Sequence, residues 1–469
     1  MNTEQEQWFE EWFEKLVKKS ASKQSYMHFD RSFNYVKRKE AIKTFFAGPI
    51  DNVSRHSFYP LIKYNKVNKR IKKIKKTDGG IGIEVKEKVR PISYAAHFDS
   101  IIYSWYAFCL SKLYTAFIKE QKFFENVIAY LPLGKSNMHF SHDVQAYIKK
   151  KGDCIAITYD IEHFFDTLGH QHLSEKWLDI LNKPQLPRDH KTLFKHVTEY
   201  SYVLKEDIES VFPETFRVDR FRYCTPAQFR KYLRGSKFIS DNPDIDKKMG
   251  IPQGLPISSV LSNIYMIDFD REISRIANEK DAFYRRYSDD IIIVCDQRNA
   301  EAIQQVIENG IRHAKLRIND SKTELRIFRV DEFGEMGCFD AAGNASKLQY
   351  LGFEFDGKQS YLRPSTVTRV ARKRKIAISS AINKAYGPTG HSTYIYRKSL
   401  GRQFHINAPS KGSSGFMKYG KSAIRALNSE SIALQLQRVS KKLEKNLKKA
   451  IEKKEAKLIR DKVTFNHKI

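Results

Sequence analysis

The stretch of residues 283–294 constrains the fold most, because it sets two neighbouring carboxylates at the tip of an apolar hairpin. Residues 291–295 are apolar and mostly β-branched, which predicts a buried strand, and residues 282–284 offer a second strand before it. Asp289 and Asp290 fall in the turn between them. Adjacent acids repel each other and are costly to desolvate, so this turn indicates a bound divalent cation. A solvated hairpin tip is the simpler alternative.

A second acidic strand end lies upstream, within residues 155–166. The apolar run 155–157 predicts a strand, Asp160 falls at its end, and aromatic residues follow where a helix or turn begins. A strand ending in Asp beside an Asp-Asp hairpin is the arrangement that two-metal phosphoryl transfer needs. Two Mg²⁺ ions about 3.5–4 Å apart can activate a 3′-hydroxyl and stabilise a leaving pyrophosphate. Mg²⁺ takes few carboxylates and leaves room for substrate phosphates.

The charge of the chain favours a polyanionic partner. Its 469 residues include 83 Lys and Arg against 54 Asp and Glu, a formal net charge of +29. Such an excess is expected of a protein that grips a nucleic-acid backbone. An anionic membrane surface is the alternative, but no apolar run close to the required ~18 residues is evident.

The cysteine spacing and the N-terminal sequence bear on zinc binding, disulfides and the location of the protein. The five cysteines are widely spread and form no CxxC pair, so neither a zinc site nor a disulfide framework is predicted. The N-terminus is rich in Glu and Trp and lacks a basic and then apolar signal sequence, which predicts a cytoplasmic protein. Residues 8–17 have amphipathic helical spacing, and we expect this helix to pack against the body of the protein.

Three boxes, which follow one another along the chain at residues 160–165, 250–265 and 287–290, resemble those of reverse transcriptases. Residues 287–290 are similar to the catalytic box of that family, residues 160–165 to its first metal-binding box, and residues 250–265 to its template- and nucleotide-contacting loop and following helix. The resemblance covers about residues 56–357. It implies an α+β fold, a right-hand polymerase palm and fingers with an antiparallel palm sheet, followed by a basic, mainly helical C-terminal thumb region. It also implies an RNA-directed DNA polymerase, a nucleotidyltransferase that uses two Mg²⁺ ions, for which Mn²⁺ can substitute.

The predicted division of the chain follows the boxes. We expect an N-terminal helical extension in residues 1–50, fingers in 51–150, and a palm in 151–362 that carries a helical insertion at about 167–248. Residues 363–469 form the basic helical thumb, with a Gly- and Ser-rich loop at 387–415. A coiled-coil oligomerisation helix is the alternative for the last segment, so an oligomer is possible.

The resemblance also implies roles for individual residues. The catalytic residues are Asp160, Asp289, Asp290 and Lys322, and the metal ligands are Asp160, Ile161, Asp289 and Asp290. The nucleotide-binding residues are Arg90, Phe165, Gln253 and Gly254, and the primer grip comprises Leu351, Gly352 and Phe353. Basic side chains expected to bind nucleic acid are Lys69, Arg70, Lys72, Lys73, Lys441 and Lys445.

Each role has a chemical reason and an alternative. An aromatic ring at Phe165 would clash with a 2′-hydroxyl and so favours deoxynucleotides, although simple core packing is the alternative. The guanidinium of Arg90 suits a triphosphate, while its partner lysine cannot be placed between Lys86 and Lys88. Lys322 could protonate the pyrophosphate or be an ordinary surface lysine. Gly254 and Gly352 would allow close backbone approach.

Residues 250–254 are called the Gly-Pro-Gln loop below. Three polar residues of the helix that follows it, Ser258, Ser259 and Asn263, are expected to face the template. The acids Glu162 and Asp166 are interpreted as solvated or as helix caps. The basic run 63–76 is either a hairpin that tracks phosphates or a solvated face.

Residues 56–62 and 94–106 resemble bacterial defence-associated (antiviral, unknown-group) reverse transcriptases, and the type 3 class among them. This resemblance implies antiphage defence, an RNA template that is a dedicated non-coding RNA, a DNA product made from dNTPs, and a second defence protein or polymerase as partner. The alternatives are a mobile-element or retron-like reverse transcriptase, a template-independent or protein-primed DNA polymerase, and a non-catalytic nucleic-acid-binding scaffold.

Overall fold

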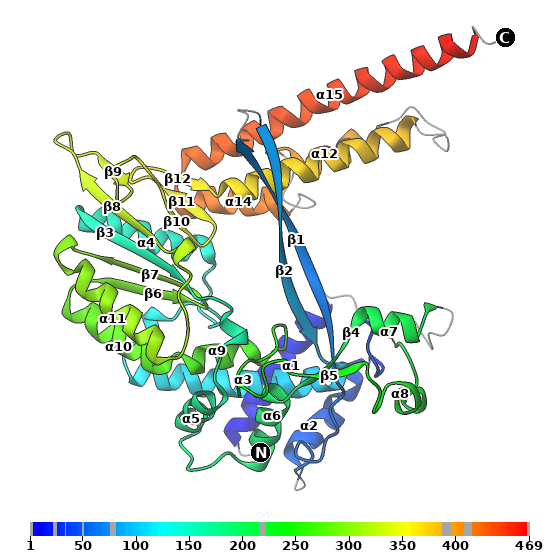
Figure 1. The fold of residues 1–469 in the computed structure, drawn as a ribbon, viewed down its shortest axis with the longest axis vertical. Helices are drawn as coiled ribbons and strands as arrows, with labels where there is room; N and C mark the ends of the chain where they lie inside the picture. The colour runs from blue at the N-terminus through cyan, green and yellow to red at the C-terminus, as the bar shows by residue number, and fades with distance from the viewer. Residues whose placement is uncertain are drawn as a thin grey trace.

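The chain was examined as a computed structural model, which describes residues 3–21, 26–32, 34–48, 51–75, 81–214, 222–386, 395–407 and 415–466. An antiparallel sheet and its helices, a long ribbon, and a C-terminal group of helices make up the described chain (Figure 1). The predicted α+β right-hand polymerase fold is confirmed.

The palm is a five-stranded antiparallel sheet in the order β6-β7-β3-β8-β9. Its central strand β3 is buried along almost its whole length, because the run from Cys154 to Tyr159 contains no charged residue. Alternate side chains of β3 and β7 face opposite sides. One set packs against α10 and α11, and the other packs against α4. The bounds are β3 (Cys154–Asp160), β6 (Phe283–Tyr287), β7 (Asp290–Cys295), β8 (Glu324–Val330), β9 (Met336–Phe339), α4 (Asn137–Lys151), α10 (Ile267–Glu279) and α11 (Ala300–His313).

The fingers contain a second sheet, in the order β2-β1-β4-β5. Strands β1 (Leu61–Lys75) and β2 (Ile81–Tyr94) pair antiparallel and form a long twisted ribbon that stands away from the palm (Figure 1). Pro91 is tolerated within β2 because β2 is an edge strand.

The predicted helical insertion at 167–248 is only partly helical. Its short strands β4 (Ser201–Leu204) and β5 (Ile239–Asp241) complete the fingers sheet, with β4 parallel to the first residues of β1. Strands of three or four residues are too short to show a periodic pattern, which explains why the sequence did not predict them. The helices here are α5 (His170–Leu181), α6 (Arg188–Thr198), α7 (Lys205–Val211) and α8 (Pro226–Tyr232).

Helices at the base of the molecule share one core with the palm. The predicted N-terminal helix, α1 (Thr3–Ala21), buries Phe9, Trp12 and Phe13, and the Trp12 indole donates to Ser104 Oγ at 3.1 Å, which confirms packing against the body. The neighbouring helices are α2 (Lys39–Ala47), α3 (His97–Glu120) and α9 (Ser258–Tyr265). Within the described ranges, α3 is the one helix long and apolar enough in composition to cross a membrane, which corrects the expectation that no such run exists. Its buried side chains belong to the main core, and this accounts for its composition.

The C-terminal region is a small sheet followed by a helical group. Helices α12 and α15 run in parallel, since Leu362 pairs with Gln435 at one end and Tyr386 donates to Glu455 at the other. The expected loop at 387–415 contains the helix α13, while residues 387–394 and 408–414 lie outside the described residues. The bounds are β10 (Leu348–Tyr350), β11 (Phe353–Phe355), β12 (Ser360–Leu362), α12 (Pro364–Tyr386), α13 (Arg397–Phe404), α14 (Gly415–Leu427) and α15 (Glu430–Asn466).

Candidate active site

The strand register brings three carboxylates to one end of the palm sheet. Asp160 ends β3 and is the direct partner of Asp290, which begins β7. Asp289 occupies the two-residue turn between β6 and β7, and its carbonyl accepts a hydrogen bond of 3.1 Å from the Ile161 amide. The turn is therefore fastened to the residue that follows Asp160, so the two acidic boxes of the sequence form one cluster.

Like charges and burial act together in this cluster. Burial, and then the carboxylates of Asp289 and Asp160, raise the pKa of Asp290 to about 7. Burial is also the largest cause that raises the pKa of Asp289, with Asp160 adding to it. Three cations oppose these effects: Lys322 forms an ion pair with Asp160, while Lys88 acts on Asp289 and Arg363 acts on Asp290. Arg363 was not among the predicted site residues, and Lys88 was one of the two lysines, with Lys86, between which the sequence could not decide.

The chemistry of these donors fits a divalent cation. Three carboxylates that repel one another at a strand end are suited to hard oxygen-binding ions such as Mg²⁺. Among the residues that the structure describes, no three His, Cys, Asp or Glu side chains converge in a ready-made metal site. Metal binding by Asp160, Ile161, Asp289 and Asp290 therefore stays a prediction.

Asp290→Asn is expected to stabilise the protein in metal-free buffer near pH 8. The amide keeps the shape of the carboxyl but removes its charge from Asp289 and Asp160, and part of the repulsion is already offset by Lys322 and Arg363. We expect the free energy of unfolding to rise by about 1–2 kcal/mol, measured by chemical denaturation. Asp246→Asn, at an exposed aspartate, is the matched control. An unchanged or lower stability for Asp290→Asn alone contradicts the repulsion argument.

The Gln253-Gly254 loop is joined to the fingers. The Ser93 amide of β2 donates to the Gln253 carbonyl at 2.8 Å. A Cβ at Gly254 would lie 2.3 Å from the Ser93 carbonyl oxygen, and the Gly254 φ of +116° is one that L side chains rarely adopt. The close approach that requires this glycine is thus to the fingers strand rather than to a base pair.

Gly254→Ala is expected to lower the free energy of unfolding by about 2–4 kcal/mol, because a backbone clash adds to backbone strain. Gly235→Ala is the matched control: Gly235 also has a positive φ, of +74°, but nothing lies within 4 Å of an added Cβ. Gly235→Ala is expected to lower the free energy of unfolding by only about 1–2 kcal/mol. Equal losses in thermal denaturation would show that the contact with Ser93 has no role.

The neighbouring rings of Phe164 and Phe165 differ in burial. Phe164 is buried in the core, whereas Phe165 is only half-buried. Both lie in the short helix η3 (Phe164–Asp166), and the Phe165 carbonyl accepts from the Ile251 amide at 2.9 Å. Both rings pack against the main core, and Phe165 also sits where the first acidic box meets the Gly-Pro-Gln loop. Its role in sugar selection stays a prediction.

A cavity of about 660 Å³ lies between the fingers strands, η3 and the Gly-Pro-Gln loop. Gln253 lines it, and so do the acids Glu162 and Asp166, so these acids are cavity residues rather than helix caps. The basic residues along its wall are Lys63, Lys247, Lys315 and Arg317.

Arg90 is exposed and, by strand alternation, shares a face of β2 with Lys88 rather than with the cavity-lining residues Pro91 and Ser93. Lys88 acts electrostatically on Asp289, so this face of β2 is the one that carries cations toward the carboxylates. Of the two lysines considered, Lys88 is thus related to the carboxylates, while the side chain of Lys86 lies outside the described residues. The roles of Arg90 and Lys88 stay predictions.

The prediction that Ser258 and Asn263 face the template is wrong. Ser258 is buried and donates to the Pro252 carbonyl at 2.6 Å, and Asn263 is buried and donates to the Ala129 carbonyl at 2.9 Å. Both satisfy backbone carbonyls inside the protein, which polar residues of a helix can do without being exposed. Ser259 is only partly exposed, and its hydroxyl donates to the Pro256 carbonyl.

The expected primer grip is the turn between β10 and β11. Leu351 and Gly352 form its two central residues, both with positive φ, and a Cβ at Gly352 would meet nothing closer than 3.9 Å. Gly352 is therefore suited by its φ and not, as the sequence suggested, by a close backbone approach. Phe353 is buried and stacks on Tyr419 of α14, so it joins the palm to the C-terminal helices.

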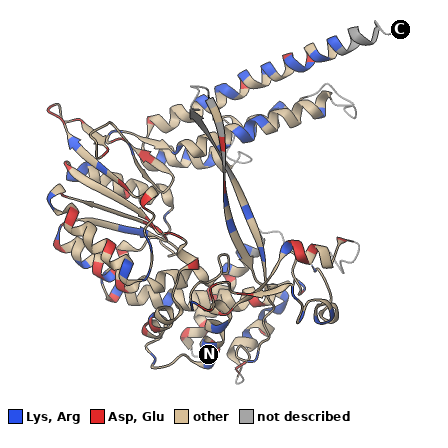
Figure 2. Cartoon of the chain, viewed as in Figure 1, with Lys and Arg blue, Asp and Glu red and all other residues tan. Residues whose placement is uncertain are grey.

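Lysines and arginines line the ribbon and the helices α12 and α15 (Figure 2). Lys441 and Lys445 are exposed on α15. Strand β1 contains Lys69, Arg70, Lys72 and Lys73, but their side chains lie outside the described residues. Arg374 of α12, unlike these exposed lysines, is buried and donates to the Val439 carbonyl at 3.1 Å.

Comparison with known families decides the identity of this fold. The sequence model described as reverse transcriptase (RNA-dependent DNA polymerase) matches residues 71–355, more than half of the chain. The chain belongs to the reverse transcriptase family. It is accordingly an RNA-directed DNA polymerase, a nucleotidyltransferase, as the three boxes predicted.

Solved structures similar to this reverse transcriptase include telomerases from two yeasts. The apo telomerase of Candida tropicalis, truncated from its C-terminal domain, is 13% identical with a TM-score of 0.39; the match covers 72% of this chain and 63% of that one. Apo telomerase of the same species is 12% identical with a TM-score of 0.39, and the match covers 96% and 77%. Telomerase of Candida albicans with a TWJ fragment of telomeric RNA is 11% identical with a TM-score of 0.36, and the match covers 89% and 66%.

Proposed function

We propose that this reverse transcriptase extends a primer with dNTPs on an RNA template by two-metal phosphoryl transfer, and that it does so in the cytoplasm as part of bacterial defence against phages. The observation that carries the catalytic part is the register of β3 and β7, in which Asp160 and Asp290 are direct partners and Asp289 lies in the adjoining turn. This supports the proposal because the two boxes are 129 residues apart in sequence (289 minus 160) and meet only through the fold.

Asp160, Asp289, Asp290 and the backbone of Ile161 would hold the metal ions. When bound, Mg²⁺ activates the 3′-hydroxyl and neutralises the leaving pyrophosphate. Lys322 lies beside Asp160 and would donate a proton to the leaving group. Lys88 and Arg90, on one face of the fingers ribbon, would bind the triphosphate. The ring of Phe165 would pack against the sugar and exclude a 2′-hydroxyl.

We assign the path of the template and product to the basic surfaces. The lysines and arginines of β1 and β2 and the exposed lysines of α15 give these elements positive charge (Figure 2). Such surfaces bind backbone phosphates regardless of sequence. In this division, residues 1–50 are an N-terminal extension, 51–150 fingers, 151–362 palm apart from the strands β4 and β5, which join the fingers sheet, and 363–469 thumb.

The proposal of antiphage defence depends on the resemblance of residues 56–62 and 94–106 to defence-associated reverse transcriptases. It includes a dedicated non-coding RNA as template and a second defence protein or polymerase as partner. In the structure these residues lie around β1 and the start of α3, and His56 pairs with the buried Asp99 at 2.6 Å. The Tyr59 amide donates to the same carboxylate at 2.9 Å.

Nucleotide incorporation by protein purified with its bound nucleic acid tests the catalytic part. We expect Mg²⁺-dependent DNA synthesis from dNTPs, and sequencing of the product identifies the template. Preference for NTPs would replace the proposal by an RNA polymerase. Synthesis without any bound or added nucleic acid would indicate template-independent or protein-primed activity, and absence of synthesis under every template condition would leave a binding role.

A plaque assay tests the biological part separately. A bacterial strain carrying the wild-type gene and its flanking sequence is expected to restrict phage growth, and the Asp289→Ala/Asp290→Ala variant to lose that restriction. Equal plaque numbers for both strains, together with active purified enzyme, would reject the defence role and favour a mobile-element enzyme.

A further inference from the structure

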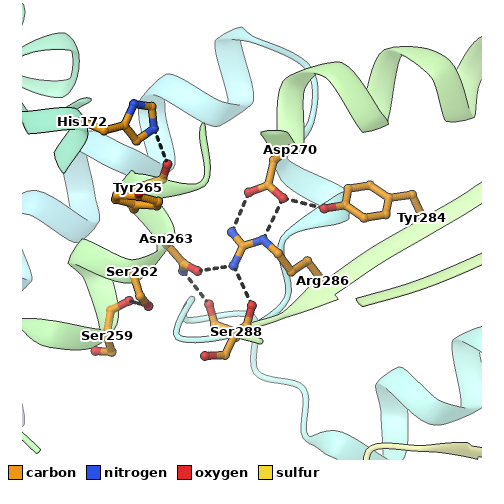
Figure 3. Close-up of polar contacts among 10 residues, drawn as sticks. His172, Ser259, Ser262, Asn263, Tyr265, Asp270, Tyr284, Arg286 and Ser288 are labelled. Atoms are coloured by element: carbon orange, nitrogen blue, oxygen red, sulfur yellow. Dashed lines mark hydrogen bonds and ion pairs between the residues drawn. The ribbon is translucent and has the colours of Figure 1, made fainter. Parts of the chain in front are cut away.

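A buried ion pair lies behind the turn that carries Asp289 (Figure 3). Arg286 of β6 and Asp270 of α10 both have side chains with no exposed surface. The guanidinium donates from Nε to Asp270 Oδ1 at 2.8 Å and from Nη2 to Oδ2 at 2.5 Å, a two-pronged contact. Tyr284 donates its hydroxyl to the same carboxylate at 2.6 Å. Both oxygens of the Asp270 carboxylate thus accept hydrogen bonds from β6.

The remaining edge of the guanidinium reaches the catalytic turn. Arg286 Nη1 donates to the Ser288 carbonyl at 3.1 Å and to Asn263 Oδ1 at 3.2 Å. Ser288 directly precedes Asp289, and Asn263 lies on α9, the helix that follows the Gln253-Gly254 loop. One side chain therefore links the turn, the helix after the nucleotide loop and α10 (Figure 3).

The turn needs such support, because Ser288 has a φ of +60°. L-residues other than glycine adopt this region at a cost and persist there when their surroundings hold them. Three further contacts hold the turn. The Tyr130 hydroxyl is 3.2 Å from Ser288 Oγ, the Ile128 amide donates to the Arg286 carbonyl at 3.0 Å, and the Ile161 amide donates to the Asp289 carbonyl at 3.1 Å. Of the two side chains that contact Ser288, Arg286 is fully buried, whereas Tyr130 is exposed.

Stability alone does not explain a pair of this kind. Removing two charges from water is costly, and apolar side chains of similar volume often replace a buried ion pair without loss of stability. An apolar pair cannot, however, donate a hydrogen bond to the Ser288 carbonyl. The property specific to Arg286 is therefore the position that it imposes on the turn.

We propose that Arg286 and Asp270 are positioning residues that set the place of Asp289 relative to Asp160. Asp270 fixes the guanidinium through two hydrogen bonds, and the guanidinium fixes the Ser288 carbonyl, one residue from the carboxylate that would bind metal. This inference rests on the proposed two-metal site, and it adds two residues that touch neither substrate nor metal.

The test compares an apolar replacement of the pair with a control in the same network. Asp270→Leu/Arg286→Met keeps the volume of the pair but removes the donor to Ser288. Tyr284→Phe removes a hydrogen bond from the same carboxylate and leaves the turn contact intact. We expect the double variant to fold, with a kcat at least about tenfold lower, a KM for dNTP within about threefold of wild type, and a higher Mg²⁺ concentration at half-maximal rate. Tyr284→Phe is expected to match wild type in all three.

Two measurements do not depend on activity. Amide hydrogen exchange in a peptide covering residues 284–291 is expected to be faster in the double variant, and binding of Mn²⁺ alone to the protein is expected to be weaker. If the double variant does not fold, Arg286→Lys replaces it, since a lysine keeps the charge but cannot serve Asp270 and Ser288 in the same geometry.

A folded double variant with wild-type kcat, Mn²⁺ binding and hydrogen exchange overturns the inference. A loss shared equally by Tyr284→Phe would assign the pair a structural role only and also overturns it. If wild-type protein neither binds Mn²⁺ nor makes DNA, the proposed function fails instead, and unchanged exchange in the turn would then count separately against the positioning role.

Discussion

Asp289→Asn is expected to reduce DNA synthesis by at least about 10³-fold, and Asp160→Asn to do the same. Each substitution removes one negative charge from a cluster that would hold the metal ions, and metal stabilisation of charge in phosphoryl transfer contributes several kcal/mol, with each 1.4 kcal/mol equal to about tenfold in rate. The amide is nearly isosteric, so the strand register of Asp160 with Asp290 should persist. Primer extension at saturating dNTP and Mg²⁺ measures the loss.

The control for this prediction is another acid of the same region. Glu162 lies two residues after Asp160 and lines the cavity, and Glu162→Gln is expected to retain activity within about tenfold. Circular dichroism and thermal denaturation should show that all three variants fold. An Asp289→Asn protein with a rate close to wild type would remove the basis for the two-metal proposal.

Phe165→Val is expected to increase the use of ribonucleotides relative to deoxynucleotides by about 10²-fold. A smaller side chain opens the place where a 2′-hydroxyl would otherwise clash, and steric discrimination in an apolar pocket spans about 10–200-fold. The measured quantity is the ratio of kcat/KM for NTP and dNTP. Because the backbone of Phe165 accepts from Ile251, the contact with the Gly-Pro-Gln loop survives the substitution.

Phe164→Leu is the matched control, since it truncates the neighbouring ring. Phe164 is buried, so this variant is expected to lose about 1–2 kcal/mol of stability without any change in sugar selectivity. If Phe164→Leu altered selectivity and Phe165→Val did not, the assignment of the two rings would be reversed. If neither did, sugar discrimination would lie elsewhere in the cavity.

The acidic cluster could be predicted from the sequence because each of its parts carries a strong local pattern. The apolar runs before Asp160 and after Asp290 fix two strands, and an acid at a strand end is visible in the sequence itself. Both strands are longer in the structure than the apolar runs predicted. Asp290 belongs to β7, and of the two acids only Asp289 lies in the turn. Pairing between two distant strands was supplied by the family resemblance and not by any local pattern.

The residues that the sequence missed have their meaning only in three dimensions. Asp270 lies among the alternating charges of an amphipathic helix, and Arg286 stands between Arg285 and Tyr287 in a strand, so both would be expected at the surface. Neither propensity nor periodicity indicates that they bury each other's charge. Arg363 was missed for a related reason, since it lies between β12 and α12, far from the boxes in sequence, and only the fold brings it to the carboxylates.

The bond between Ser93 and Gln253 has a mechanical consequence for the fingers. Because the Ser93 amide donates to the Gln253 carbonyl and the Ser93 carbonyl lies against Gly254, we expect the base of the ribbon and the nucleotide loop to move together. We therefore expect any closing motion over a substrate to occur in the ribbon beyond this point, with its pivot near Ser93. Twelve residues separate Ser93 from Ile81, which makes a lever of about 40 Å. A rotation of only about 5° at the pivot would sweep the far end of such a lever through about 3–4 Å.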